Sequence, residues 1–127
     1  MYYFKSYADL LAAGRISLGD EVNFSVPTGN FGDILAGYLA KRLGLPVGKL
    51  ICASNANNIL TDFIRTGTYD RMRPLLKTTS PSMDILVSSN LERLLYLLSG
   101  DTKLVAELMG KLNKEGSYTV PADLLEK

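Results

Sequence analysis

The sequence predicts an α/β fold, in which part of a parallel sheet is flanked by helices as half of a three-layer α/β/α domain, with a helical C-terminal part. Between residues 20 and 67, a strand pattern, a polar loop and a helix pattern follow one another twice, and such repeats pair their strands in parallel. Hydrophobic residues make up 46% of the 127 residues, which is typical of a globular domain. We therefore expect one unit over 1–127, with a βαβα part (20–67) followed by a connection and helices (68–127).

The N-terminal half alternates between helix patterns, with apolar residues three or four positions apart, and strand patterns, with alternate or continuous apolar residues. In order, we expect a helix over 2–13, a strand over 22–26, a helix over 33–43, a strand over 49–53 and a helix over 59–66. A glycine follows each helix and marks its end, because glycine readily adopts the positive φ of a helix C-cap: Gly14, Gly44 and Gly67.

The C-terminal half is predicted to be an irregular connection followed by helices. In order, we expect an irregular stretch over 68–82, a helix over 84–98, a helix from 101 to about 113, an extended stretch over 117–120 and a final helical turn opened by Pro121. Ser82 is the expected cap of the helix over 84–98, with Asp84 in its first turn. The alternative is that hydroxyls of this segment line an active-site entrance.

Two further polar groups have both a structural and a functional interpretation. Ser88–Asn90 lies on the helix predicted over 84–98, which we expect to pack on the sheet, although small polar side chains there could face a cofactor cleft. Arg65, Arg71 and Arg73 cluster around a turn. Arginine suits a phosphate-bearing substrate, but ion pairs of this cluster with Asp62 or Asp70 are at least as well supported.

The composition argues against several classes of protein. Net charge is +1, from 14 basic and 13 acidic residues, so the charge gives no electrostatic argument for binding nucleic acid or an anionic membrane. Histidine is absent and Cys52 is the single cysteine, which argues against a metal site or a disulfide. No apolar stretch is long enough for a transmembrane helix and no secretory signal pattern opens the chain. We expect a cytoplasmic protein that binds neither nucleic acid nor a membrane.

The segment Thr28–Asp33, hereafter the loop, is the chemically informative part of the sequence. It joins a strand to a helix, at the carboxyl end of the strand, where open α/β sheets bind ligands. The first peptide nitrogens of a helix have no acceptor within the helix, and they favour an anion. Gly29 and Gly32 allow a close approach of the backbone, and Asn30 tolerates a positive φ. We expect Asp33 to turn its carboxylate back onto loop amides.

The spacing of the glycines does not identify a known nucleotide site. Gly29 and Gly32 are too close for a P-loop, and the dinucleotide fingerprint needs a third glycine. From spacing alone, a plain glycine-assisted turn is as well supported as an anion site.

Three segments follow one another along the chain: residues 22–38, which include the loop, residues 44–55 with 58–63, and residues 80–95 with the run Ser-Pro-Ser-Met-Asp-Ile. In this order, they resemble threonine synthase, an enzyme that uses pyridoxal 5'-phosphate (PLP). The resemblance implies the fold type II architecture of tryptophan-synthase-like enzymes. It also implies that threonine and phosphate are made from O-phosphohomoserine and water.

In that family, the loop binds the phosphate of PLP, largely through backbone amides. The resemblance therefore assigns cofactor binding to the loop residues Thr28, Gly29, Asn30, Phe31, Gly32 and Asp33. The family's reactive lysine lies upstream of the loop in a Phe-Lys-Asp context. Here the only Phe-Lys pair is Phe4-Lys5, followed by Ser6 in a predicted helix, so we interpret Lys5 as a solvated residue.

The expected protein is thus an internal fragment of the PLP domain that is inactive alone, because the reactive lysine is missing. The alternatives are a non-enzymatic phosphate- or anion-binding module, or a fragment of another fold type II PLP enzyme. A partial sheet should expose apolar edges, so we also expect self-association.

Overall fold

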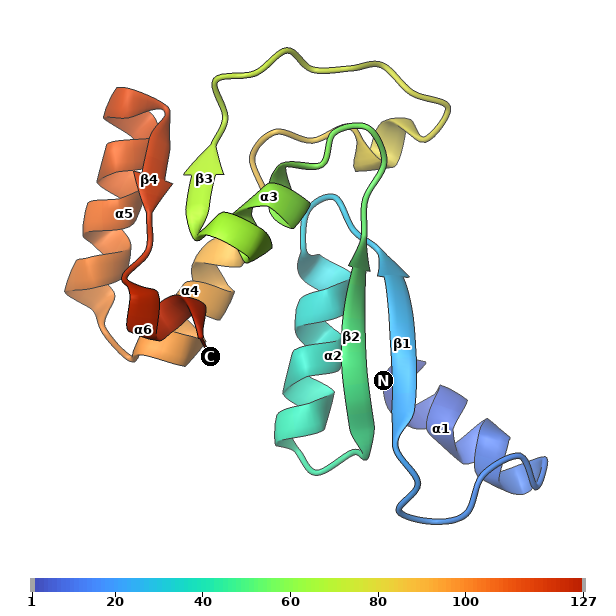
Figure 1. Cartoon of the computed structure of the whole chain (residues 1–127). Helices are drawn as coiled ribbons and strands as arrows, with labels where there is room; N and C mark the ends of the chain where they lie inside the picture. The colour runs from blue at the N-terminus through green and yellow to red at the C-terminus, as the bar shows by residue number, and fades with distance from the viewer. Residues whose placement is uncertain (1, 127) are drawn as a thin grey trace.

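The computed structural model describes residues 2–126 and confirms the α/β class (Figure 1). Its elements, in chain order, are α1 (Tyr2–Ala12), β1 (Val22–Pro27), α2 (Gly32–Arg42), β2 (Val47–Ala53), α3 (Ile59–Thr66), β3 (Thr68–Asp70), the 3-10 helix η1 (Pro81–Met83), α4 (Leu91–Ser99), α5 (Thr102–Glu115), β4 (Ser117–Thr119) and α6 (Ala122–Leu125).

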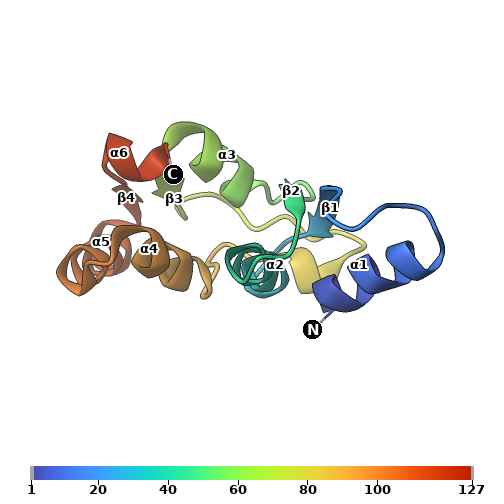
Figure 2. The ribbon, with the colours of Figure 1, turned by 90° about the horizontal axis from the view of Figure 1, so that it is seen from below.

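The strands β1 and β2 form a two-stranded parallel sheet, joined through α2. Figure 2 shows α1 and α2 on one side of this sheet and α3 on the other side. The layered arrangement predicted for the N-terminal half is therefore present. Because the strands are parallel, their carboxyl ends meet at one edge, where the loop leaves β1 (Figure 1).

Helix α1 packs closely on α2 and the sheet through Tyr3. The Tyr3 side chain is buried, its ring lies edge-on to Phe24 with centroids 4.9 Å apart, and its hydroxyl donates to the Asp33 carbonyl over 2.9 Å. Gly37 makes room for this contact, because a Cβ there would lie 2.8 Å from ring atoms of Tyr3. Among the aromatic residues at the start of the chain, Tyr3 and Tyr7 are thus part of the core, whereas Tyr2 and Phe4 are exposed.

A second, antiparallel sheet joins β3 to β4, with Tyr69 paired opposite Tyr118. The two rings stack with centroids 5.5 Å apart, and Phe63 lies edge-on to both. The sequence predicted an extended stretch near β4 but placed β3 in an irregular connection. The connection begins only after Asp70.

The helix predicted over 84–98 is wrong in its first half, because α4 begins at Leu91. Ser82 lies inside η1 and caps no helix. The Asp84 carboxylate instead binds the amides of Asn55 and Asn57 and the backbone and hydroxyl of Thr78. These contacts hold the connection that crosses the carboxyl ends of β1 and β2 (Figure 1).

Most of the remaining boundaries agree with the expectations. Gly14 and Gly67 have positive φ at the ends of α1 and α3, and Asp101 caps α5 by accepting from Lys103 and Leu104 nitrogens. Of the arginine cluster, Arg73 pairs with Asp62 over 2.8 Å, as its structural interpretation predicted.

Residues 2–126 contain neither a membrane-spanning helix nor a cluster of metal ligands. None of their helices has the length and apolarity needed to cross a membrane. Within the same range, no group of three or more candidate ligands is placed to hold a metal ion.

Candidate functional site

The loop leaves β1 and turns into α2 through a residue in the left-handed conformation. That residue is Phe31, with φ 64° and ψ 4°, whereas the sequence pointed to Asn30 as the position that tolerates positive φ. The Phe31 side chain is buried, with Ile34, Leu94 and Leu95 lining the same apolar cavity. Burial of the ring holds the backbone in a conformation that a phenylalanine rarely adopts.

The peptide nitrogens of Gly29 through Asp33 have no hydrogen-bond acceptor within residues 2–126. Such a run of unpartnered donors at a helix start, with the helix dipole behind it, favours an anion. Thr28 differs, because its nitrogen donates to the Ala53 carbonyl over 2.7 Å and its hydroxyl donates to the Val26 carbonyl over 2.7 Å. Thr28 therefore bonds the last residues of β1 and β2, and both of its donors are used within the protein.

The expected role of the Asp33 carboxylate is wrong. No side chain caps the start of α2, and Asp33 is exposed beside Tyr3, Ser25 and Pro27 in a cavity of about 180 Å³. Burial, with the nearby charge of Asp33, raises the pKa of Tyr3 to about 12. Tyr3 therefore stays protonated at neutral pH and can donate to the Asp33 carbonyl.

The two loop glycines make room for protein contacts. A Cβ on Gly29 would lie 3.1 Å from the Met83 Cα and 3.2 Å from the Ser82 carbonyl oxygen, both in η1. A Cβ on Gly32 would lie 3.3 Å from the Asn90 amide nitrogen. The loop is thus packed against the segment 82–90, of which the sequence had placed residues 84–90 on a helix.

Residues Ser88, Ser89 and Asn90, hereafter the clamp, hold the loop from that side. The Ser88 hydroxyl donates to the Gly29 carbonyl, and the Asn90 amide donates to the Asn30 carbonyl over 2.9 Å. The Asn30 side-chain oxygen accepts from the Ser89 nitrogen over 2.7 Å and from its hydroxyl over 2.8 Å. Sequence reasoning missed this contact, and the only available signal was the run of small polar residues itself.

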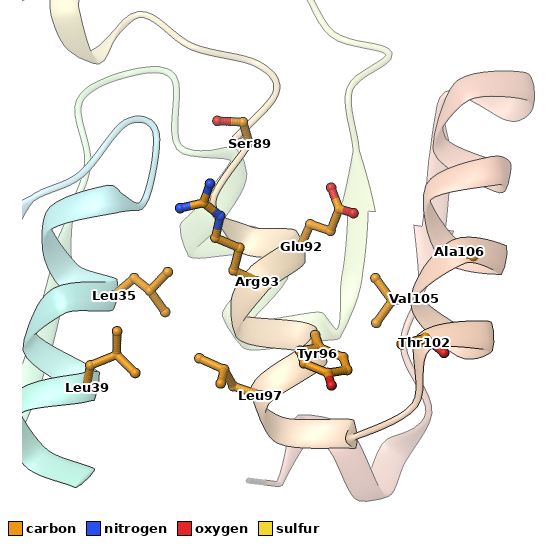
Figure 3. Close-up of a pocket in the computed structure, with 10 residues that line it drawn as sticks. All are labelled: Leu35, Leu39, Ser89, Glu92, Arg93, Tyr96, Leu97, Thr102, Val105 and Ala106. Atoms are coloured by element: carbon orange, nitrogen blue, oxygen red, sulfur yellow. The ribbon is translucent and has the colours of Figure 1, made fainter. Parts of the chain in front are cut away.

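An open groove of about 770 Å³ runs beside the clamp between α2, α4 and α5 (Figure 3). Leu35 and Leu39 of α2 face Leu97 of α4 across it, while Ser89 marks its upper end near the loop (Figure 3). Cys52 lies in a different, apolar cavity, and burial raises the pKa of its thiol. Both facts are typical of a cysteine that packs as a small apolar residue.

No family model matches the chain. Threonine synthase of Pseudomonas aeruginosa is 50% identical over 121 residues, and that of Saccharomyces cerevisiae is 44% identical over 135 residues. These alignments cover 94% and 98% of this chain. The crystal structure of PLP-bound threonine synthase from Brucella melitensis is 47% identical and superposes on 98% of the chain with a TM-score of 0.88.

The chain is homologous to a segment of threonine synthase.

The match is to a small part of each relative. The chain spans 24% of the Pseudomonas enzyme and 26% of the yeast and Brucella threonine synthases. It also matches threonine synthase-like 1 of Homo sapiens, with 50% identity over 129 residues and 17% of that protein. The resemblance of residues 22–38, 44–55 with 58–63, and 80–95 to threonine synthase is confirmed, and the similarity extends over nearly all of the chain.

Proposed function

We propose that this chain supplies the phosphate-binding loop of a PLP-dependent threonine synthase. The observation that carries the proposal is the run of peptide nitrogens from Gly29 to Asp33 without acceptors, at the start of α2. A phosphate group offers several acceptor oxygens and negative charge, so it complements these donors and the helix dipole. The homologous Brucella structure contains PLP, which supports PLP as the source of that phosphate.

Among the predicted residues, the proposal relies on the backbone nitrogens of Gly29, Asn30, Phe31, Gly32 and Asp33. Asn30 adds a side-chain amide whose oxygen faces the clamp, which leaves its nitrogen for a ligand. Thr28 is left out, because both of its donors are used within the sheet end. Asp33 contributes its nitrogen, while its exposed carboxylate makes no contact with the loop amides.

The proposed reaction of the whole enzyme is the conversion of O-phosphohomoserine and water to threonine and phosphate. PLP supplies the electron sink for this chemistry when it is bound. The residues described here would anchor and orient the cofactor's phosphate. The 127 residues contain no lysine in a Phe-Lys-Asp context, and we expect no threonine formation from this chain alone. A threonine-forming rate comparable to that of a full-length relative would contradict this expectation.

Phosphate binding can be tested directly on the chain labelled with ¹⁵N. Titration with inorganic phosphate, against chloride of equal ionic strength, should shift the amide signals of Gly29–Asp33 selectively. The variant Asn30→Asp keeps the oxygen that the clamp binds but adds a negative charge beside the loop. It should weaken phosphate binding at least about tenfold, because like charges at short range repel.

The matched control is Asn113→Asp, which adds the same charge at an exposed position on α5. It should leave the phosphate affinity unchanged. The proposal is wrong if phosphate shifts no amide between Gly29 and Asp33, or if both variants change the affinity equally. Binding of phosphate but no recovery of activity when the rest of the enzyme is supplied would favour the alternative, a non-enzymatic anion-binding module.

A further inference from the structure

We propose that Ser88, Ser89 and Asn90 are positioning residues, whose hydrogen bonds hold the loop so that its peptide nitrogens stay free for phosphate. The inference rests on the proposed function, since it explains how the loop is kept ready for that ligand. It concerns a segment 59 or 60 residues further along the chain, which makes no contact with the ligand in this proposal.

In the contacts between the clamp and the loop, the clamp only donates hydrogen bonds and the loop only accepts them. Every hydrogen bond that the clamp makes to the loop ends on an oxygen, namely the carbonyls of Gly29 and Asn30 and the side-chain oxygen of Asn30. None of these bonds uses a loop nitrogen. The clamp therefore satisfies the acceptors of the loop and leaves its donors available.

Because the peptide bond is planar, fixing a carbonyl oxygen of the loop also fixes the direction of the N–H that follows it. In a trans peptide, the carbonyl of one residue and the N–H of the next lie in one plane and point in opposite directions. Holding the Gly29 carbonyl therefore directs the Asn30 N–H away from the clamp. Holding the Asn30 carbonyl does the same for the Phe31 N–H.

The clamp is itself fixed to a buried aromatic cluster. The Ser88 nitrogen donates to the Tyr69 hydroxyl over 2.9 Å, and this hydroxyl donates to the Leu86 carbonyl over 2.9 Å. Tyr69 is 1% exposed and stacks on Tyr118. A rigid support of this kind is what a positioning segment needs, because a mobile partner could not fix the loop.

Helix capping at the start of α4 does not explain the contacts of the clamp. Asn90 occupies the position where an asparagine side chain commonly caps its own helix. Here no side chain caps α4, and the Asn90 amide bonds the loop instead. The residue thus stabilises a distant element rather than the helix that follows it.

The test compares three forms of the full chain: the wild type, the double variant Ser88→Ala with Asn90→Ala, and a control with Ser17→Ala and Asn113→Ala. Both control side chains are exposed, and within residues 2–126 neither makes a hydrogen bond. Phosphate affinity is read from the amide signals of Gly29–Asp33, loop order from ¹⁵N relaxation, and stability from thermal unfolding.

We expect the double variant to bind phosphate about tenfold more weakly, since two hydrogen bonds of ordinary strength are lost. Its Asn30 and Phe31 amides should lose order, while the control behaves as the wild type does. Unchanged affinity and unchanged loop order in a folded double variant would overturn the proposal. If the double variant does not fold, Asn90→Ala alone, at a half-buried position, should lower the affinity about threefold, and an unchanged affinity would again overturn it.

The two proposals can fail separately. If phosphate does not bind the wild type, the proposed function is wrong. The order of the Asn30 and Phe31 amides then decides the role of the clamp. A loss of order confined to the clamp variants supports it, and equal order in all three forms overturns it.

Discussion

At Phe31, the backbone conformation destabilises the fold, whereas burial of the side chain stabilises it. A φ of 64° suits glycine, whereas the buried ring contributes to the core beside Leu94 and Leu95. Left-handed backbone costs a residue with a Cβ about 1–2 kcal/mol, and burying a phenylalanine side chain contributes about 1.5–3 kcal/mol. Burial therefore wins at this position, and sequence patterns that assign positive φ to asparagine or glycine miss it.

This balance predicts an unusual order of two substitutions. Phe31→Ala should reduce the free energy of unfolding by about 3–5 kcal/mol. Phe31→Gly should cost about 1 kcal/mol less than Phe31→Ala, because glycine removes the backbone strain along with the ring. Urea unfolding of both variants measures the difference. A glycine variant less stable than the alanine variant would show that the left-handed conformation carries no strain here.

The hydrogen bonds of the Asp84 carboxylate should make the stability of the fold depend on pH. Its carboxylate accepts bonds from Thr78, Asn55 and Asn57, and the Thr78 bonds in particular hold its pKa below the usual range. A depressed pKa stabilises the fold above the unfolded value of about 3.9, and this contribution is lost as the pH falls through the folded pKa.

The variant Asp84→Asn should therefore melt a few degrees below the wild type at pH 7, and the gap should narrow as the pH falls below about 4. Asp123→Asn is the control, because the exposed Asp123 side chain makes no hydrogen bond within residues 2–126. Melting curves at several pH values provide the comparison. A gap that is the same at neutral and acidic pH would show that the charge of Asp84 is unimportant.

At the scale of elements, glycines inside two helices have opposite roles. A Cβ on Gly37 of α2 would lie 2.8 Å from Tyr3 ring atoms and 2.9 Å from a Leu50 methyl carbon, while a Cβ on Gly110 of α5 would meet nothing within 4 Å. Gly37 is therefore a contact point between α1, α2 and β2. Gly110 has no such role.

The same substitution should thus have opposite signs. Gly37→Ala is expected to lower the free energy of unfolding by about 1–3 kcal/mol through overpacking. Gly110→Ala should raise it by about 0.5–1 kcal/mol, because alanine favours a helix interior. Chemical denaturation of the two variants gives both values. A stabilised Gly37→Ala would mean that Tyr3 moves aside at little cost.

Some elements could be predicted from local sequence patterns and others could not. The strands and helices of residues 22–66 were predictable, because each has its own apolar pattern and is bounded on at least one side by a glycine or proline. The irregular stretch 84–90 was not, because Asp84 and Ser88 bond residues far away in the sequence, such as Asn55 and Gly29. The loop was found from its glycines, whereas the clamp depends on tertiary contacts that no local pattern records.

At the scale of the whole molecule, much apolar surface is exposed around the small parallel sheet. Within residues 2–126, neither outer edge of β1–β2 has a strand partner. Leu18 is 84% exposed, Leu43 is 77% exposed and Ile51 on β2 is 49% exposed. Open edges with apolar neighbours favour association with further chains.

We therefore expect the isolated chain to self-associate as its concentration rises, with light scattering as the measurement. Ile51→Lys should reduce the association, because it places a charge on the exposed face of β2. Ala36→Lys adds the same charge at an exposed site without removing a large apolar side chain. A chain that stays monomeric at high concentration contradicts the expectation, as does an equal effect of both substitutions.

The pairing of β3 with β4 joins Thr68–Asp70 to Ser117–Thr119, near the two ends of the C-terminal half. During synthesis, Tyr69 is translated before Tyr118. The aromatic support of Ser88 is therefore complete only once residues 117–119 have been made, whereas the segments that form β1, α2 and β2 are made earlier. In the growing polypeptide, Phe63 and Tyr69 remain without their later aromatic neighbour, and apolar surface exposed in this way is prone to aggregation until Tyr118 is in place.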